Sequence, residues 1–140
     1  MTLVTTVMRV QQMMLARMDE VLAPFGLTFA RYELLMLLDF TRSGSLPVGK
    51  IGERLQVHPT SVSSAVGRLE GQGMVVRVPH PTDGRTTLVG ITGDGRATVK
   101  RATAAVNAEV FADLPVSGAE VDELLQLLDA YRRNAGDITP

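Results

Sequence analysis

The sequence predicts a mainly α-helical domain that carries one small β-hairpin. Along most of the 140 residues, apolar side chains recur every three or four positions, which is the spacing of amphipathic helices. Between residues 74 and 91, two short runs rich in valine, threonine and isoleucine instead favour β structure. They flank Pro81–Arg85, in which Asp83-Gly84 is a typical turn signal. The length suits a single domain.

The first helix is expected at residues 3–22, where apolar residues form two adjacent stripes. A helix with two such stripes must bury more than one face. Pro24 ends it. Thr28 is expected to cap a second helix that continues to Phe40, and residues 41–45 are expected to form a loop.

Two short helices follow, at about residues 48–55 and 59–72, joined by a tight turn at residues 56–58. Pro59 fits the first turn of the second helix, because its missing N–H has no intrahelical partner there. Gly73 ends this helix as a C-terminal cap.

The hairpin strands are expected at residues 74–78 and 86–91. Thr92 then caps a long helix that reaches about Asp113. Ser117 and Glu120 have the spacing of a capping box, which begins a last helix at about residues 118–133. The apolar stripe of that helix consists of Val121, Leu124, Leu128 and Tyr131.

Composition excludes several classes of protein. The absence of cysteine excludes disulfides, thiolate zinc sites and thiol-based redox sensing. No apolar run is long enough to span a bilayer, and the N-terminal segment lacks the apolar stretch of a signal peptide. We therefore expect a cytoplasmic protein with no membrane partner.

Charge is distributed unevenly along the chain. The formal net charge is −1, but residues 50–101 hold eight basic and four acidic side chains, so the centre carries about +4. A basic centre between acidic flanks is a candidate surface for a polyanion.

The second of the two short helices has the features of a DNA-reading helix. Its apolar stripe faces the core, and the opposite face carries small hydroxyl side chains that can approach base edges and phosphates. A helix-turn-helix places such a helix in the major groove. The residues expected to contact double-stranded DNA here are Pro59, Thr60, Ser61, Ser63, Ser64 and Arg68.

The hairpin directly after this helix is expected to form a wing beside it. Arg85 at the turn would enter a narrow minor groove, whose negative potential attracts arginine. Asp83 would hold the Arg85 side chain in one rotamer, and Arg77 at the base of the wing would bind phosphate. We include all three in the predicted DNA site.

Four segments together resemble the MarR family of transcription regulators: Lys50–Val57, Ser61–Val75, Pro81–Arg85 and Ile91–Arg96. The resemblance implies one domain over residues 1–140, with a winged helix-turn-helix at about 28–92. It also implies dimerisation helices at about 3–23 and 93–135. The implied function is that of a homodimeric regulator, either a repressor or an activator and preferentially a repressor, on a pseudo-palindromic operator.

The sequence departs from the family pattern at two positions. Gly84 stands where the wing usually carries a basic residue, and Ser64 stands where the helix often carries a larger polar or basic residue. Each departure removes one possible DNA contact.

The resemblance also implies release from DNA by a small aromatic or acidic effector. The candidate pocket residues are Met14, Arg17, Phe29, Tyr32 and Met36, with Arg17 as the partner of the anion. Methionine and aromatic residues at helical spacing are also typical of an ordinary core, so both interpretations stay open.

Neither an enzyme nor a metal site is expected. The run Gly90–Gly95 lacks the lysine of a phosphate-binding loop, and His58 and His80 have no helical pair or cysteine to complete a zinc site. We expect no cofactor. The alternative function is a winged-helix module that binds another protein without binding DNA; such a module should expose apolar anchor residues.

Overall fold

The computed structural model describes residues 1–137. In chain order its elements are α1 (Thr2–Leu22), η1 (Ala23–Phe25), α2 (Phe29–Phe40), β1 (Ser45–Pro47), α3 (Val48–Leu55), α4 (Pro59–Gly71), β2 (Val75–Pro79), β3 (Thr87–Ile91), α5 (Gly93–Glu109), η2 (Phe111–Asp113) and α6 (Gly118–Asn134). The mainly helical fold with a β-hairpin wing is therefore confirmed.

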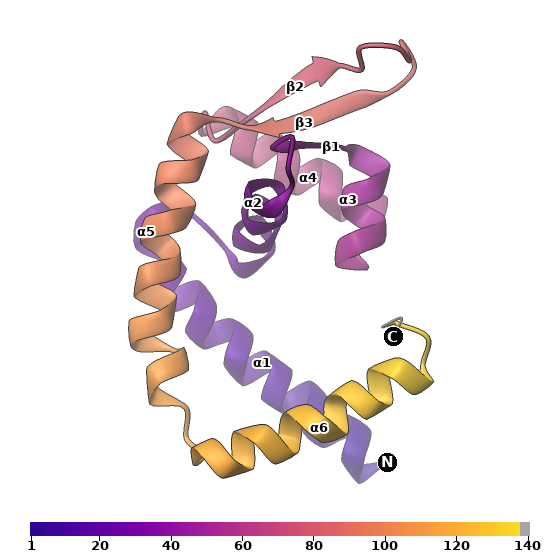
Figure 1. Ribbon diagram of the computed structural model, residues 1–140. Helices are drawn as coiled ribbons and strands as arrows, with labels where there is room; N and C mark the ends of the chain where they lie inside the picture. The colour runs from indigo at the N-terminus through magenta and orange to yellow at the C-terminus, as the bar shows by residue number, and fades with distance from the viewer. Residues whose placement is uncertain (138–140) are drawn as a thin grey trace.

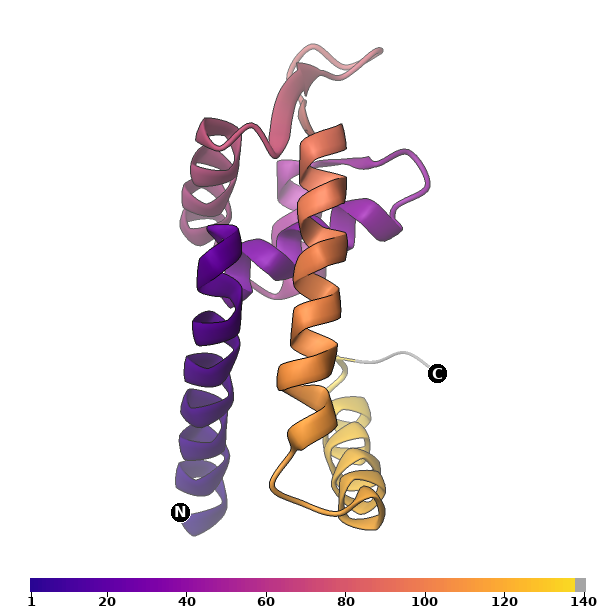
Figure 2. The same ribbon diagram turned by 90° about the vertical axis from the view of Figure 1, so that its left-hand side faces the viewer.

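The elements form two parts (Figure 1). Helices α2, α3 and α4 and the sheet make up the head region, residues 28–92, from which the β2–β3 hairpin projects as a wing. Helices α1 and α5 leave this region side by side (Figure 2). Helix α6 turns back from the end of α5 (Figure 1).

The sheet is antiparallel, with strand order β1-β3-β2. In its register Leu46 lies opposite Val89, and Val78 lies opposite Leu88. Strand β1 was not anticipated, because its three residues end in Pro47 and follow a Gly- and Ser-containing run that has no strand pattern of its own. Its place is decided by burial of Leu46 and by pairing with β3.

The core lies inside the head region and at the adjoining ends of α1 and α5. Helix α1 contributes only its last turns to this core, through Met18, Val21 and Leu22. The largest fully buried side chains are all aliphatic: Leu22, Leu34, Leu35, Leu38, Ile51, Val62, Val66, Leu69, Val75, Val89, Val99 and Val106.

Local sequence signals placed most helix ends correctly. Thr28, Thr92 and Ser117 each accept a hydrogen bond from the backbone N–H three residues later, and Ser117 with Glu120 forms the expected capping box. The expected end of the long helix at Asp113 is wrong: α5 ends at Glu109, and residues 111–113 form a 3₁₀ turn. The expected end of the predicted domain, residues 138–140, lies outside the described residues.

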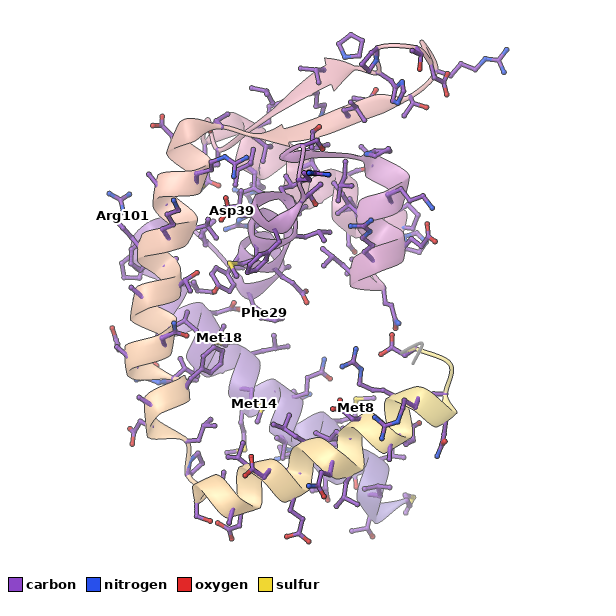
Figure 3. All side chains as sticks on the ribbon, viewed as in Figure 1. Met8, Met14, Met18, Phe29, Asp39 and Arg101 are labelled. Carbon is purple, nitrogen blue, oxygen red and sulfur yellow. The ribbon has the colours of Figure 1, made fainter. Side chains whose placement is uncertain are left out.

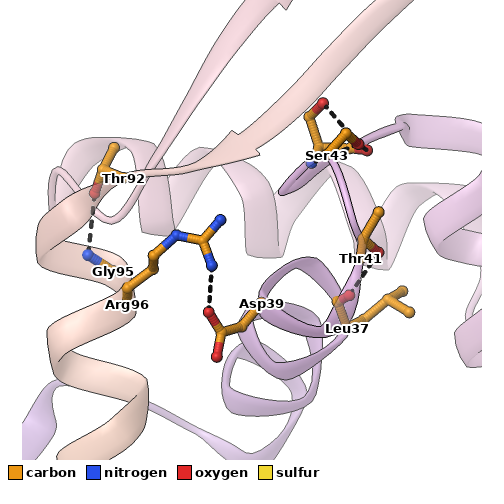
Figure 4. Close-up of polar contacts among 8 residues, drawn as sticks. Leu37, Asp39, Thr41, Ser43, Thr92, Gly95 and Arg96 are labelled. Carbon is orange, nitrogen blue, oxygen red and sulfur yellow. Dashed lines mark hydrogen bonds and ion pairs between the residues drawn. The ribbon is translucent and has the colours of Figure 1, made fainter.

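The start of α5 is bonded to the junction between α4 and β2. The Thr92 hydroxyl donates to the Gly73 carbonyl over 2.7 Å, and the Thr92 N–H donates to the Met74 carbonyl over 3.0 Å. The backbone at Gly95 passes so close that a Cβ there would lie 2.2 Å from the Met74 oxygen. One turn onward, Arg96 pairs with Asp39 of α2, as Figure 4 shows. The wing base, α2 and α5 are thus tied together.

Within residues 1–137, no single helix combines the length and the apolar character needed to cross a membrane. Only Thr2–Phe25 and Phe29–Phe40 taken together reach that composition, and they are bent by 71° relative to each other.

Candidate nucleic-acid interface

Helices α3 and α4 form the predicted helix-turn-helix. Gln56 ends α3 in a left-handed conformation, with φ at 52°, and this reverses the chain within three residues. A Cβ at Gly52 would approach the Val57 carbonyl oxygen to 3.1 Å, so a small residue allows the tight turn. Pro59 then occupies the first turn of α4, where its missing N–H costs nothing.

Burial fixes which face of α4 is available to a partner. Val62, Val66 and Leu69 are buried against the head region. The residues of α4 predicted to contact DNA all lie on the exposed side: Pro59, Thr60, Ser61, Ser63, Ser64 and Arg68. The exposed face therefore carries hydroxyls, Pro59, the cation of Arg68 and the carboxylate of Glu70, and no large apolar anchor.

The wing is a two-stranded hairpin closed by a turn that local hydrogen bonds define. His80 N–H donates to the Thr86 carbonyl over 3.1 Å, and Thr86 N–H donates back to the Asp83 carbonyl over 3.1 Å. Arg85 lies in the exposed part of this turn. The sequence thus placed Arg85 correctly at the tip of the wing.

The expected role of Asp83 is wrong. Its carboxylate accepts from the backbone N–H of Arg85 over 3.0 Å and from the hydroxyl of Thr86 over 2.8 Å. Within residues 1–137, no ion pair joins it to the Arg85 guanidinium, because the carboxylate is already turned toward the backbone of the loop. These hydrogen bonds, first that from the Arg85 backbone and then that from Thr86, lower the pKa of Asp83. Asp83 shapes the turn and leaves the Arg85 side chain unpaired with it.

Arg77 is already paired within the chain. Its Nε lies 3.6 Å from Oε1 of Glu70, and both side chains are partly exposed. Such an exposed pair contributes little free energy, so a phosphate could compete for Arg77.

An open depression of about 790 Å³ separates α3 from the wing. Lys50, Arg77 and Arg85 contribute cations to its lining, and Glu53 and Asp83 contribute carboxylates. A hydrogen bond and the charge of Lys50 lower the pKa of Glu53, so this carboxylate stays ionised beside the lysine. Lys50 was not among the predicted site residues. It lines the depression opposite the wing, and this proximity depends on the tertiary fold and not on the local sequence.

Neither of the two depressions described within residues 1–137 is lined by any of the candidate effector residues. Tyr32 donates to or accepts from Thr103 over 2.9 Å, and Thr103 also approaches the Met36 sulfur at 3.4 Å, so both residues pack against α5. Met14 is exposed on the part of α1 that extends away from the head region, whereas Phe29 lies at the start of α2 (Figure 3). Arg17 donates to Glu20 over 2.9 Å and to the Glu109 carbonyl over 3.2 Å.

Comparison with known proteins decides the family. Residues 25–86 match the sequence profile of the MarR family. The crystal structure of Sco5413, a MarR family transcriptional regulator from Streptomyces coelicolor, has a TM-score of 0.88 and 45% sequence identity. The alignment covers 99% of this chain and 96% of that chain. The chain belongs to the MarR family.

Two further relatives extend the comparison. The transcriptional repressor CouR, in a structure bound to a 23-mer DNA duplex, is 28% identical with a TM-score of 0.82, over 90% of this chain and 89% of that chain. An HTH-type transcriptional regulator of Mycobacterium tuberculosis is 34% identical over 70 residues, which is 50% of this chain and 49% of the relative. The chain thus spans about half the length of the curated mycobacterial relatives that it matches. Sco5413, CouR and the Mycobacterium tuberculosis relative are all described as transcriptional regulators or repressors, in line with the expectation that the chain is not an enzyme.

Proposed function

We propose that this MarR family member is a homodimeric, sequence-specific DNA-binding repressor. In this proposal α4 enters the major groove of each operator half-site, and Arg85 enters the flanking minor groove. One observation carries the proposal: a helix whose inner face is buried in the core presents mainly small hydroxyl side chains and Arg68 outward, with its exposed Glu70 paired to Arg77, and a hairpin with an exposed arginine follows it directly. That surface suits a wet, cationic DNA interface better than a protein partner.

The DNA complex of CouR, at 28% identity, supports the proposal. The homodimer is supported by surface that the single chain leaves uncovered. Large apolar side chains are exposed along the first four turns of α1 and along α6: Leu3, Val4, Val7, Met8, Val10, Met13, Met14, Leu124, Leu125, Leu127, Leu128 and Tyr131. A two-fold dimer through these helices would offer two α4 helices to successive major grooves, about 34 Å apart.

The proposal includes release by a small aromatic or acidic effector bound between α1, α2 and α5. Arg17 is the cation available there, and an acidic effector would have to replace Glu20 as its partner. Binding of benzoate-type acids, followed by calorimetry with the normal protein and with Arg17→Ala, tests this part separately.

The decisive experiment is selection from a random duplex DNA library with the purified protein, followed by titration of the selected DNA at several salt concentrations. We expect an inverted repeat with half-sites about one helical turn apart and a steep decrease of affinity with salt. Absence of any enriched sequence would contradict the proposal and favour a winged helix that binds protein.

Arg85→Ala should weaken binding to the selected operator roughly 5- to 150-fold, the range typical of losing one arginine contact to a base, about 1–3 kcal/mol. Fluorescence anisotropy at physiological salt measures it. Arg101→Ala is the matched control, because Arg101 points outward from α5, away from the wing (Figure 3). Equal affinities of the two variants would show that the wing tip does not contact DNA.

A further inference from the structure

The only two histidines of the sequence stand at corresponding places in the two proposed DNA-reading elements. His58 is the N-cap of α4, and its Nδ1 accepts from the Thr60 N–H over 3.2 Å. His80 begins the turn of the wing, and its Nδ1 accepts from the Thr82 N–H over 3.2 Å and from the Asp83 N–H over 3.1 Å. Both imidazoles therefore cap backbone N–H groups.

These contacts are all satisfied by one protonation state of each ring, and at His80 the Thr82 hydroxyl, 3.3 Å from Nδ1, can donate to that nitrogen as well. A backbone N–H can only donate, so the Nδ1 facing it must carry a free electron pair. The ring is then neutral, with its proton on Nε2. Protonation places a second hydrogen on Nδ1, pointing at the N–H groups that it now accepts from, and the cap is lost.

In the wing, two successive hydrogen bonds link His80 to Arg85. His80 accepts from the Asp83 N–H, and the Asp83 carboxylate accepts from the N–H of Arg85, whose side chain is proposed to enter the minor groove. In α4, loss of the His58 cap leaves the Thr60 N–H without that acceptor, at the turn that carries Thr60 and Ser61 to the DNA. An imidazolium there also faces the positive end of the helix dipole.

We propose that His58 and His80 are positioning residues of the DNA interface and together make it sensitive to protons. The neutral rings hold the start of α4 and the turn of the wing in the DNA-binding form, and protonation releases both. The proposal rests on the proposed DNA-binding function. The expected sign follows directly: affinity is full while both rings are neutral and falls when lower pH protonates them.

Other charged groups act on the two rings. Around His80 they are Lys50 and Glu53 from α3, Arg77 from β2, and Asp83 and Arg85 in the turn. Asp83 attracts an imidazolium and opposes the release, whereas the three cations favour it.

On the chain segment before His58, Arg54 lies in the last turn of α3, and Gln56 donates to the carboxylate of Asp137. Asp83 itself is ionised throughout the range from pH 5.5 to 8, because its pKa lies below the usual value. It therefore does not supply the pH dependence.

The first test uses the protein without DNA. Long-range ¹H–¹⁵N NMR spectra at pH 8 should show the proton on Nε2 of both rings. Between pH 8 and 5.5, the amide resonances of Thr60, Thr82 and Asp83 should shift along with the titration of the imidazoles. A proton on Nδ1 at pH 8, or amide shifts that ignore the ring titration, would overturn the caps irrespective of any DNA binding.

The second test measures operator affinity between pH 8 and 5.5 in variants with an asparagine or a glutamine at either position. Asparagine Oδ1 takes the place of Nδ1 and does not titrate, whereas glutamine Oε1 takes the place of Nε2. We expect the normal protein to lose about fivefold affinity per histidine, because each lost cap destabilises the DNA-binding form by about 1 kcal/mol, as the loss of an N-cap typically destabilises a helix. His58→Asn and His80→Asn should bind normally at pH 8 and each remove its share of the pH dependence. His58→Gln and His80→Gln should bind weakly at every pH.

Two results would overturn the proposal: an affinity that rises as pH falls, which means that imidazolium contacts phosphate, or a pH dependence that survives both asparagine variants. If the normal protein binds no DNA at pH 8, the proposed function is contradicted, and so is the proposed effect of the two histidines on DNA affinity. The NMR measurement then still decides whether the rings are proton-sensitive caps.

Discussion

At the scale of single residues, Gly84 is the clearest departure from the family pattern. It lies at the tip of the wing between Asp83 and Arg85, its φ is not positive, and a Cβ built on it would meet no atom within 4 Å. Neither backbone conformation nor space requires glycine here. The turn can therefore accept a side chain at this position, including the basic side chain that the family usually has there.

Gly84→Lys should therefore increase operator affinity and steepen its salt dependence. One added phosphate contact changes the slope of log affinity against log salt by about 0.9. Titration at four or more salt concentrations measures it, and Gly84→Ala controls for the loss of glycine. An unchanged slope in the lysine variant would show that the wing tip does not approach the phosphates.

Residue roles were predictable from sequence where they depend on near neighbours of favoured types. Threonine or serine before an apolar run identified the caps at Thr28, Thr92 and Ser117, because these side chains commonly accept from the first turn of a helix. The cap at His58 was missed because histidine is not a typical N-cap residue. The pairing of Asp83 with the Arg85 guanidinium was wrong because spacing alone does not tell a side-chain partner from a backbone one.

At the scale of elements, the start of α5 depends on close backbone contact. A Cβ on Gly95 would meet the Met74 carbonyl oxygen at 2.2 Å and the Ile91 side chain at 2.9 Å. Gly93, two residues earlier in the same turn, has no atom within 4 Å of the corresponding position. The two glycines therefore have opposite tolerances, which the sequence pattern does not distinguish.

Gly95→Ala should lower the free energy of unfolding by roughly 1–3 kcal/mol, as overpacking typically does. Gly93→Ala is the matched control and should be neutral or stabilise the protein by up to about 1 kcal/mol, because alanine restricts the unfolded chain. Urea denaturation followed by circular dichroism measures both. Equal midpoints for the two variants would mean that the junction of β2 and α5 is looser than described.

The elements themselves were largely predictable, since helical periodicity and turn residues act over a few positions. The two exceptions depend on distant contacts. Strand β1 exists because Leu46 is buried and pairs with Val89, more than 40 positions away in the chain. Helix α5 ends at Glu109, four residues before its expected end, and the reversal toward α6 begins with the 3₁₀ turn at Phe111–Asp113.

At the scale of the whole molecule, the terminal helices present more apolar surface than one chain can cover. Within residues 1–137, α6 has no buried residue, and Leu124 and Leu128 are each 48% exposed. In α1 only the last turns reach the core. Sequence periodicity showed that these stripes exist, but whether the chain covers them itself depends on the tertiary arrangement.

Charging the stripe of α6 should separate the proposed dimer. Leu124→Glu combined with Leu128→Glu should shift the protein to monomers in sedimentation equilibrium and weaken operator binding, while circular dichroism stays helical. Gln126→Glu, an exposed position on the same helix, is the control. Deleting all of α1 would be a poor test, because Met18, Val21 and Leu22 belong to the core. A dimer that survives both glutamates would place the interface elsewhere.

Helix α5 has a mechanical consequence. Its first turn is bonded to the base of the wing through Thr92, and its last residue accepts from Arg17 of α1. Its 17 residues span about 25 Å. A tilt of only about 10° would displace one end relative to the other by roughly 4 Å, close to the spacing of neighbouring base pairs. A tilt of α5 would therefore move its contacts with the base of the wing and with α1 together.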